Sequence, residues 1–351
     1  MAEVRTDALD EARAYLCVDA FMVDMAGATA LSTAFETGVV DHLAQHASGS
    51  MDHLRDALKL DARGLQFLLG LLRANGVIDT GTDALALTPA FRAALVFRDV
   101  LEAKLYFAKQ VAPDLVQLLT ALLMAPARFA EHARIFKLFA YQHAMVSTPD
   151  NLERTARWMR LTTALTRYEA GAFVAAHDVS RYRRMLDVGG NSGEFALQLC
   201  RANPALEATV YDLPVVCDIG AAHVAAQPEG HRVRFVRRDR AQPALPAGHD
   251  LVTFKSMLHD WPDAEMADFL RRAHDALAPG GTLLIFERRQ LPVDNDALSL
   301  PYGQVPLMLF FRSYRTPQAY RAQLSALGFQ SITVAEVLLD MPFLLITATR
   351  P

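Results

Sequence analysis

Met185-Leu-Asp-Val-Gly-Gly-Asn-Ser-Gly-Glu194 decides the fold, because an apolar strand pattern leads directly into a glycine-rich turn and then into a helical stretch. Glycines let the backbone turn sharply and approach a ligand closely. The turn lacks Gly-Lys-Ser/Thr, which excludes a P-loop, and it departs from the Gly-x-Gly-x-x-Gly of dinucleotide folds. A carboxylate at the start of the helix would repel a pyrophosphate and suits a cofactor with a cationic amino group. A tight turn without a ligand is the alternative.

From residue 181 onward, short β-type runs alternate with helical stretches, which predicts a mainly parallel sheet covered on both faces. The expected strands are residues 185–188, 208–211, 233–236, 251–254, 282–286, 332–335 and 343–347. The expected helices centre on residues 195–201, 216–226, 265–276 and 317–327. Ligands of such α/β sheets bind beyond the carboxyl ends of the strands, so we expect the functional residues just after strands.

Acidic residues follow the expected strands as this rule requires. Asp212-Leu213-Pro214 ends the second strand, about 20 residues beyond the glycine turn, where an acid can accept both ribose hydroxyls of an adenosine. A helix cap is the alternative role for Asp212. Asp239 and Arg240 follow the third strand, and Asp239 is placed to bind the adenine amine. This pattern favours an adenosine-binding methyltransferase fold over a redox fold.

A histidine follows the fourth strand in the string Lys255-Ser-Met-Leu-His259-Asp-Trp. Its pKa lies near neutrality, which makes His259 a natural general base for an aromatic or enolic hydroxyl. A lone histidine is more often structural, but its place at the carboxyl end of a strand favours the catalytic role. Glu287 ends the fifth strand, so we expect it to face the same cleft and orient the imidazole.

The first 180 residues are predicted to be almost entirely helical. Helices followed by a short hairpin over 77–87 form a winged-helix-like pattern, which raises the possibility of DNA binding. The candidate recognition helix is rich in leucine and the hairpin lacks a basic cluster, so we favour a structural or dimerising role. We expect an N-terminal dimerisation domain over 1–100, a helical substrate-pocket region over 101–180 with boundaries at Pro113, Pro126 and Pro149, and a Rossmann-like domain over 181–351.

The composition indicates a soluble intracellular protein. A net charge of −4 with 21% charged residues gives no electrostatic reason to expect nucleic acid as a partner. Cys17, Cys200 and Cys217 are too few and too scattered for a disulfide framework or a zinc site, so we expect no metal. The N-terminus lacks a signal-peptide pattern and no apolar run approaches the ~18 residues of a membrane span. A cytoplasmic location is therefore expected.

These motifs resemble the plant-type small-molecule O-methyltransferases and their bacterial antibiotic-pathway relatives, the caffeic acid and hydroxyneurosporene O-methyltransferase group. The resemblance covers nearly the whole chain, and Leu258-His-Asp-Trp261 is its most specific part. It implies a seven-stranded class I methyltransferase fold, a swapped-helix homodimer, S-adenosyl-L-methionine as cofactor and S-adenosyl-L-homocysteine as product. The implied catalytic residues are His259, Glu287 and Tyr314. The turn, the strand ends and the resemblance together give these cofactor-binding residues: Met159, Thr163, Asp187, Gly189, Gly190, Ser192, Glu194, Asp212, Leu213, Asp239, Arg240 and Lys255.

Two departures from the family pattern bear on the chemistry. The family turn reads Gly-Gly-Gly-Thr-Gly, whereas this chain has Asn191, a residue that tolerates positive φ. The family's second glutamate beside the histidine is replaced here by Tyr314, in a segment about two residues short. A phenol supplies no negative charge at neutral pH, so we expect less stabilisation of the imidazolium.

Methylation of a phenol or enol hydroxyl in a small, mostly apolar specialised metabolite is the first hypothesis. The candidate pocket walls are Phe107, Phe136, Phe139, Tyr141, Met145, Phe310 and Phe311. The alternative keeps the cofactor but carries out N-methylation, or decarboxylation, hydroxylation or pericyclic chemistry that uses the sulfonium electrostatically. A third hypothesis is a non-enzymatic winged-helix regulator, against which the intact His259-Asp-Trp string argues.

Overall fold

The computed structural model describes residues 6–46, 49–80, 84–139, 141–239, 244–291, 301–310 and 313–351. The chain divides into two compact units, which we call the sheet unit and the helical unit. The sheet unit comprises Met1–Ala14, Phe139–Asp294 and Leu309–Pro351, and the helical unit comprises Tyr15–Leu138 and Asn295–Met308.

These units differ from the three segments expected from the sequence. Helix α7, Arg98–Met124, runs without a break past residue 100. Helix α10, Pro149–Ala176, buries Phe173 in the core beneath the sheet, so the stretch before residue 180 is part of the sheet unit. The boundary between the units depends on which core each of these two helices packs into, and composition alone does not show this.

Seven strands form one sheet in the order β5-β4-β3-β6-β7-β9-β8. The neighbours from β5 to β7 pair in parallel, and β9 pairs antiparallel with both β7 and β8. The strands are β3 Arg184–Val188, β4 Glu207–Asp212, β5 Val233–Arg237, β6 His249–Lys255, β7 Leu277–Arg288, β8 Gln330–Leu338 and β9 Pro342–Thr349. The predicted α/β class and all seven expected strands are confirmed, and each strand extends beyond its predicted range at one or both ends.

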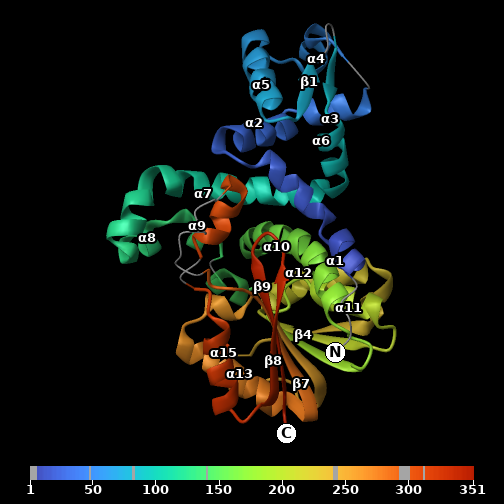
Figure 1. Ribbon diagram of the computed structural model, residues 1–351, viewed down its shortest axis with the longest axis vertical. Helices are drawn as coiled ribbons and strands as arrows, with labels where there is room; N and C mark the ends of the chain where they lie inside the picture. The colour runs from blue at the N-terminus through green and yellow to red at the C-terminus, as the bar shows by residue number, and fades with distance from the viewer. Residues whose placement is uncertain are drawn as a thin grey trace. The chain divides into compact units, whose positions relative to one another are not determined.

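Helices cover both faces of this sheet (Figure 1). Helices α10, α11 and α12 share one apolar core with the sheet, and α13 and α15 share a second core on the opposite face. The central strands are buried on both sides, which explains their uninterrupted apolar sequences. The helices and 3-10 helices (η) of the unit are α1 Thr6–Ala12, η3 Tyr141–Met145, α10, α11 Glu194–Ala202, α12 Pro214–Ala225, η4 Pro228–Arg232, η5 Leu258–Asp260, α13 Asp263–Ala276 and α15 Pro317–Ala326.

The strand order places a topological switch point between β3 and β6. The chain moves outward from β3 through β4 to the edge strand β5, and then returns to place β6 on the other side of β3. Loops after β3 and β6 therefore diverge at the carboxyl ends of these strands, which is where open α/β sheets bind ligands.

The helical unit contains the predicted winged-helix-like arrangement. Strands β1, Ile78–Thr80, and β2, Leu85–Leu87, pair antiparallel, and α5 buries Leu65, Leu69 and Leu72 in the core. The helices and 3-10 helices of this unit are η1 Ala14–Phe21, α2 Met25–Glu36, α3 Val39–Gln45, α4 Met51–Leu58, α5 Ala62–Ala74, α6 Pro89–Ala94, η2 Leu95–Phe97, α7 Arg98–Met124, α8 Pro126–His132, α9 Arg134–Leu138, η7 Tyr302–Gln304 and α14 Val305–Met308.

One of the three predicted proline boundaries is wrong. Pro126 and Pro149 begin α8 and α10, but Pro113 lies inside α7. The next residue, Asp114, is buried and accepts hydrogen bonds from the backbone N–H groups of Arg134 and Ile135. These contacts hold α7 beyond the proline and offset its cost of roughly 3 kcal/mol.

Across the described residues, no single helix has both the length and the apolar character of a membrane span, although the bent pair η1 and α2 meets both criteria together.

A buried ion-pair cluster joins α10 to the centre of the sheet. Glu169 on α10 is paired with Lys255 at the end of β6 and, at 2.6 Å, with Arg288 at the end of β7. Burial acts to raise the pKa of Glu169, but the two cations and their hydrogen bonds outweigh it and lower the pKa to about 2. The carboxylate therefore stays charged throughout the neutral range.

Replacing Glu169 by glutamine will destabilise the fold by about 3 kcal/mol, because two buried cations lose their shared counter-charge. Urea unfolding at pH 7 measures this, with Glu153→Gln as the control, since Glu153 forms an exposed pair with Arg157 on the same helix. Because folding lowers the Glu169 pKa, its stabilising contribution is complete above the ordinary carboxyl range and is lost as the pH falls toward 2. Equal losses in the two variants at pH 7 would contradict this role.

Candidate active site

The glycine turn after β3 has the backbone conformation that its sequence predicts. Gly189 and Gly193 have φ values of +71° and +78°, and Asn191 adopts +57°, in the left-handed region expected of it. A side chain at Gly189 would come within 2.5 Å of Met257, and one at Gly190 within 2.5 Å of the Asp187 carboxylate. The turn is therefore packed so closely that only glycine fits at these two positions.

Asp212, at the end of β4, lies directly beside this turn. Its Oδ2 accepts a hydrogen bond from the backbone N–H of Asn191 at 2.8 Å, and its Oδ1 accepts one from Leu213 at 2.6 Å. Burial raises the pKa of Asp212 to about 6 despite these bonds. Each oxygen keeps a further lone pair, so the carboxylate can still accept a hydrogen bond from a ligand.

Helix α10 brings two further predicted residues to the turn. Thr163 Oγ1 lies 2.7 Å from Ser192 Oγ, and Met159 is buried one turn earlier in the helix. Asp187 beneath the turn accepts a hydrogen bond from Thr253, while its buried Oδ2 has no partner among the described residues. Burial raises the pKa of Asp187 to about 7.

Asp239 is exposed just past the end of β5, and Arg240 lies outside the described residues.

Two predicted cofactor residues have other partners in the structure. Glu194 accepts hydrogen bonds from His223 at 2.7 Å and Gln198 at 2.8 Å, so both carboxylate oxygens already have partners within the protein. Burial acts to raise the pKa of Glu194, but these bonds and the charge of Arg167 lower it. Lys255 pairs with Glu169, as described above, and donates to Thr166 at 2.9 Å. Glu194 thus links α11 to α12, whereas Lys255 links β6 to α10.

His259, in the short helix η5 after β6, is held by Glu287 at the end of β7. The imidazole Nδ1 lies 2.7 Å from Glu287 Oε2, and Glu287 Oε1 accepts the backbone N–H groups of Met257 and Leu258 at 2.7 Å each. Glu287 is fully buried, which acts to raise its pKa, but His259 and the two N–H groups lower it. A charged carboxylate at Nδ1 leaves Nε2 as the basic nitrogen.

Two further groups lie beside the His259 ring, Asp260 and Tyr314. Asp260 Oδ1 lies 3.4 Å from Nε2, and its Oδ2 accepts a hydrogen bond from the Tyr141 hydroxyl at 2.6 Å. Tyr314 packs edge-on against the imidazole, with ring centroids 5.2 Å apart. Burial alone would lower the pKa of His259, but Glu287 and Asp260 raise it above its ordinary value.

An aromatic cluster adjoins these residues within the sheet unit. Trp158 packs against Phe139, with ring centroids 6.0 Å apart, and against Tyr141 at 5.8 Å, and Phe139 also contacts Phe310. The sequence did not single out Trp158, although it directly precedes Met159 on α10. Three predicted pocket residues therefore come together around a tryptophan.

The other candidate wall residues have different positions. Phe107 and Phe136 lie in the helical unit, Phe311 lies outside the described residues, and Met145 ends η3.

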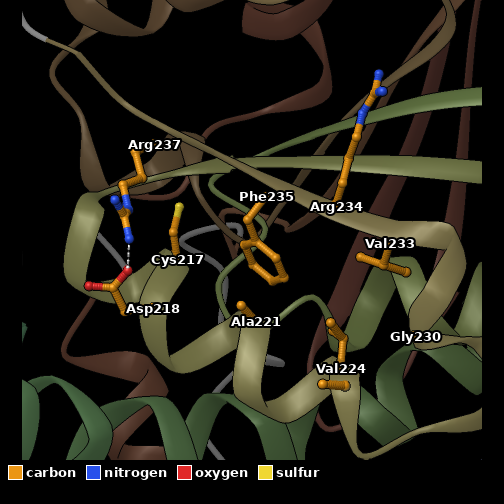
Figure 2. A pocket seen from close by; sticks show the side chains of 10 residues that line it. Cys217, Asp218, Ala221, Val224, Gly230, Val233, Arg234, Phe235 and Arg237 are labelled. Carbon is orange, nitrogen blue, oxygen red and sulfur yellow. Dashed lines mark hydrogen bonds and ion pairs between the residues drawn. The ribbon is translucent and has the colours of Figure 1, made fainter.

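A separate open hollow of about 660 Å³ lies between α12 and the edge strand β5. Figure 2 shows Cys217, Ala221 and Val224 of α12 with Phe235 of β5, and an Asp218–Arg237 ion pair at one end. None of its lining residues is a predicted site residue. It runs along the strand and not across the carboxyl ends, so we do not assign the site to it.

The chain matches the O-methyltransferase domain family over residues 125–330, more than half of its 351 residues. It is 40% identical over 139 residues to 3-hydroxy-5-methyl-1-naphthoate 3-O-methyltransferase of Streptomyces sahachiroi, covering 40% of this chain and 39% of that one. It is 32% identical over 192 residues to O-demethylpuromycin-O-methyltransferase of Streptomyces alboniger, covering 54% and 49%. Each match spans less than half of the relative's length.

The fold is similar to solved structures over nearly the whole chain. Mitomycin 7-O-methyltransferase superposes with a TM-score of 0.72 at 22% identity, over 92% of this chain and 94% of that one. At 22% identity the structural similarity establishes only the fold, whereas the match to the family model establishes family membership. The glycine turn and the histidine–glutamate pair lie within the matched residues, and the chain belongs to the O-methyltransferase domain family.

Proposed function

We propose that this protein is an S-adenosyl-L-methionine-dependent O-methyltransferase that acts on a phenol or enol hydroxyl of a small, mostly apolar acceptor. The observation that carries the proposal is the imidazole of His259, whose Nδ1 is hydrogen-bonded to the buried Glu287 at 2.7 Å. The similarity to 3-hydroxy-5-methyl-1-naphthoate 3-O-methyltransferase and O-demethylpuromycin-O-methyltransferase supports the same type of reaction.

The residues at the carboxyl ends of β3 and β4 fit the cofactor. Because the turn carries glycines, no side chain at these positions prevents the cofactor from approaching the backbone. The Asp212 oxygens can accept hydrogen bonds from the ribose hydroxyls. Thr163 and Met159 would line the same turn from α10, and the Ser192 hydroxyl in the turn lies 2.7 Å from that of Thr163. Glu194 already accepts hydrogen bonds from His223 and Gln198, which leaves its carboxylate less available to the cofactor's amino group. Asp187, whose buried Oδ2 has no hydrogen-bond partner among the described residues, is the better candidate to bind the cofactor's amino group.

When bound, S-adenosyl-L-methionine supplies an electrophilic methyl group and leaves as S-adenosyl-L-homocysteine. The chain's own contribution is to free the acceptor oxygen of its proton. Nε2 of His259 takes this proton, and the resulting imidazolium is stabilised by the carboxylate of Glu287 at Nδ1. The aromatic cluster around Trp158 would orient a planar acceptor by its apolar face.

Replacing His259 by alanine will reduce methyl transfer by about 10²–10⁴-fold, the usual contribution of a general base. The assay follows a labelled methyl group into a panel of phenols and enols, with calorimetry showing that S-adenosyl-L-homocysteine binding is retained. His274→Ala, a histidine on α13 outside the site, is the matched control. Undiminished transfer in the His259 variant would rule out its role as the base.

The second candidate is a reaction that uses the sulfonium only electrostatically, and the presence of Tyr314 beside His259 favours it. Product formation without one equivalent of S-adenosyl-L-homocysteine would establish this alternative. Amine analogues in the same panel test N-methylation.

Replacing Asp212 by asparagine will weaken S-adenosyl-L-homocysteine binding by about tenfold or more, since a charged acceptor is lost at the ribose position. Isothermal titration calorimetry measures the affinity. Asp218→Asn serves as the control, because Asp218 on α12 pairs with Arg237 at the hollow and not at the turn. An unchanged affinity would place the cofactor elsewhere.

We also propose that the protein is a homodimer in which a second copy covers the C-terminal half of α7. Val116, Leu119, Leu123 and Met124 there have exposed fractions of 72%, 49%, 75% and 81%. Such an apolar stripe is costly to leave in water. No nucleic-acid or membrane partner is proposed, and the three free cysteines support a reducing, cytoplasmic location.

Replacing both Leu119 and Leu123 by glutamate will convert the dimer into a monomer, as measured by analytical ultracentrifugation. Val96→Glu introduces the same charge at an equally exposed apolar position outside the stripe and is the control. A wild-type protein that sediments as a monomer, or a double variant that remains dimeric, would refute this interface.

A further inference from the structure

The imidazole of His259 has a second carboxylate beside it that the sequence pattern does not predict. At position 314 this chain has a tyrosine, which packs on the imidazole but carries no charge at neutral pH. Asp260 approaches from the other side, with Oδ1 at 3.4 Å from Nε2, and its side chain is 22% exposed. The nitrogen that would receive the proton therefore has its own anionic neighbour.

Asp260 is held in this position by one phenol. The Tyr141 hydroxyl donates to Asp260 Oδ2 at 2.6 Å, across 119 residues of sequence. The Tyr141 ring packs edge-on against Trp158, which fixes the direction of the hydroxyl. With Oδ2 engaged by Tyr141, the remaining oxygen, Oδ1, is the one that faces the imidazole.

We propose that Tyr141 is a positioning residue that holds Asp260 in its charged form beside Nε2 of His259, so that Asp260 supplies the second negative charge that Tyr314 does not. The catalytic role of Tyr141 and Asp260 rests on the proposed methyl transfer with His259 as the base. Its physical basis is Coulombic: an anion within about 4–6 Å of an imidazole stabilises the protonated ring.

The other groups around His259 do not account for this charge. Glu287 faces Nδ1 on the opposite edge of the ring, and Arg288 on the same strand acts to lower the His259 pKa. Arg315 donates to the backbone carbonyl oxygens of Leu258 and Trp261, which flank His259 and Asp260. Asp260 is thus the anion on the Nε2 side. Its own pKa is raised by burial, and the hydrogen bond from Tyr141 counteracts this increase.

The test is the titration of His259 followed by NMR of protein labelled at histidine, with the His259 resonance assigned through His259→Ala. This readout needs no acceptor, so it remains informative even if the proposed methyl transfer is wrong. Asp260→Asn removes the charge at nearly constant size, and Tyr141→Phe removes only the hydroxyl and keeps the ring on Trp158. Tyr182→Phe, which removes a phenol bonded to His177, is the control.

We expect the His259 pKa to fall by about 1 unit in Asp260→Asn and by a smaller amount in Tyr141→Phe, with no change in Tyr182→Phe. Once an acceptor is known, the acidic limb of kcat/KM should move to lower pH in the same order, because the base is then deprotonated at lower pH. An unchanged His259 pKa in Asp260→Asn would overturn the role of Asp260. An unchanged pKa in Tyr141→Phe alone, or a change only in acceptor KM, would overturn the positioning role of Tyr141.

Discussion

The hydrogen bond between Glu287 and His259 is the interaction on which the rest of the site depends. A carboxylate with no exposed surface costs several kcal/mol to bury, and only good hydrogen-bonding geometry offsets that cost. Here three donors satisfy it: the imidazole Nδ1 and the backbone N–H groups of Met257 and Leu258. The same carboxylate therefore fixes the path of the chain after β6 and the orientation of the ring.

The sheet topology places the histidine–glutamate pair beside the glycine turn. The glycine turn follows β3 and the histidine follows β6, and these adjacent strands flank the switch point. Helix α10 contacts both parts of the site. Thr163 contacts the glycine turn after β3, and Glu169 pairs with Lys255 at the end of β6. A site built on paired strands and one long helix is more rigid than one built on loops, which favours precise placement of the reacting groups.

Much of this arrangement follows from the sequence, and the rest depends on contacts between distant segments. Short β-type runs alternating with helical stretches predicted all seven strands, and the turn chemistry predicted the positive φ of Asn191. The protein partners of Glu194 and Lys255 could not be predicted from the sequence, because His223 and Glu169 lie 29 and 86 residues away. The Tyr141–Asp260 contact escaped prediction for the same reason. Local patterns give elements and turns, whereas charge pairing in the folded protein decides which acids are available to a ligand.

Glu287 is expected to fix the imidazole with Nδ1 protonated and Nε2 as the base, and ¹⁵N NMR of His259 above its pKa measures this tautomer. The chemical shifts of the two ring nitrogens distinguish the neutral tautomers. We expect the Nδ1–H tautomer in the wild-type protein and its loss when Glu287 is replaced by alanine. A neutral His259 that carries its proton on Nε2 in the wild-type protein would contradict it.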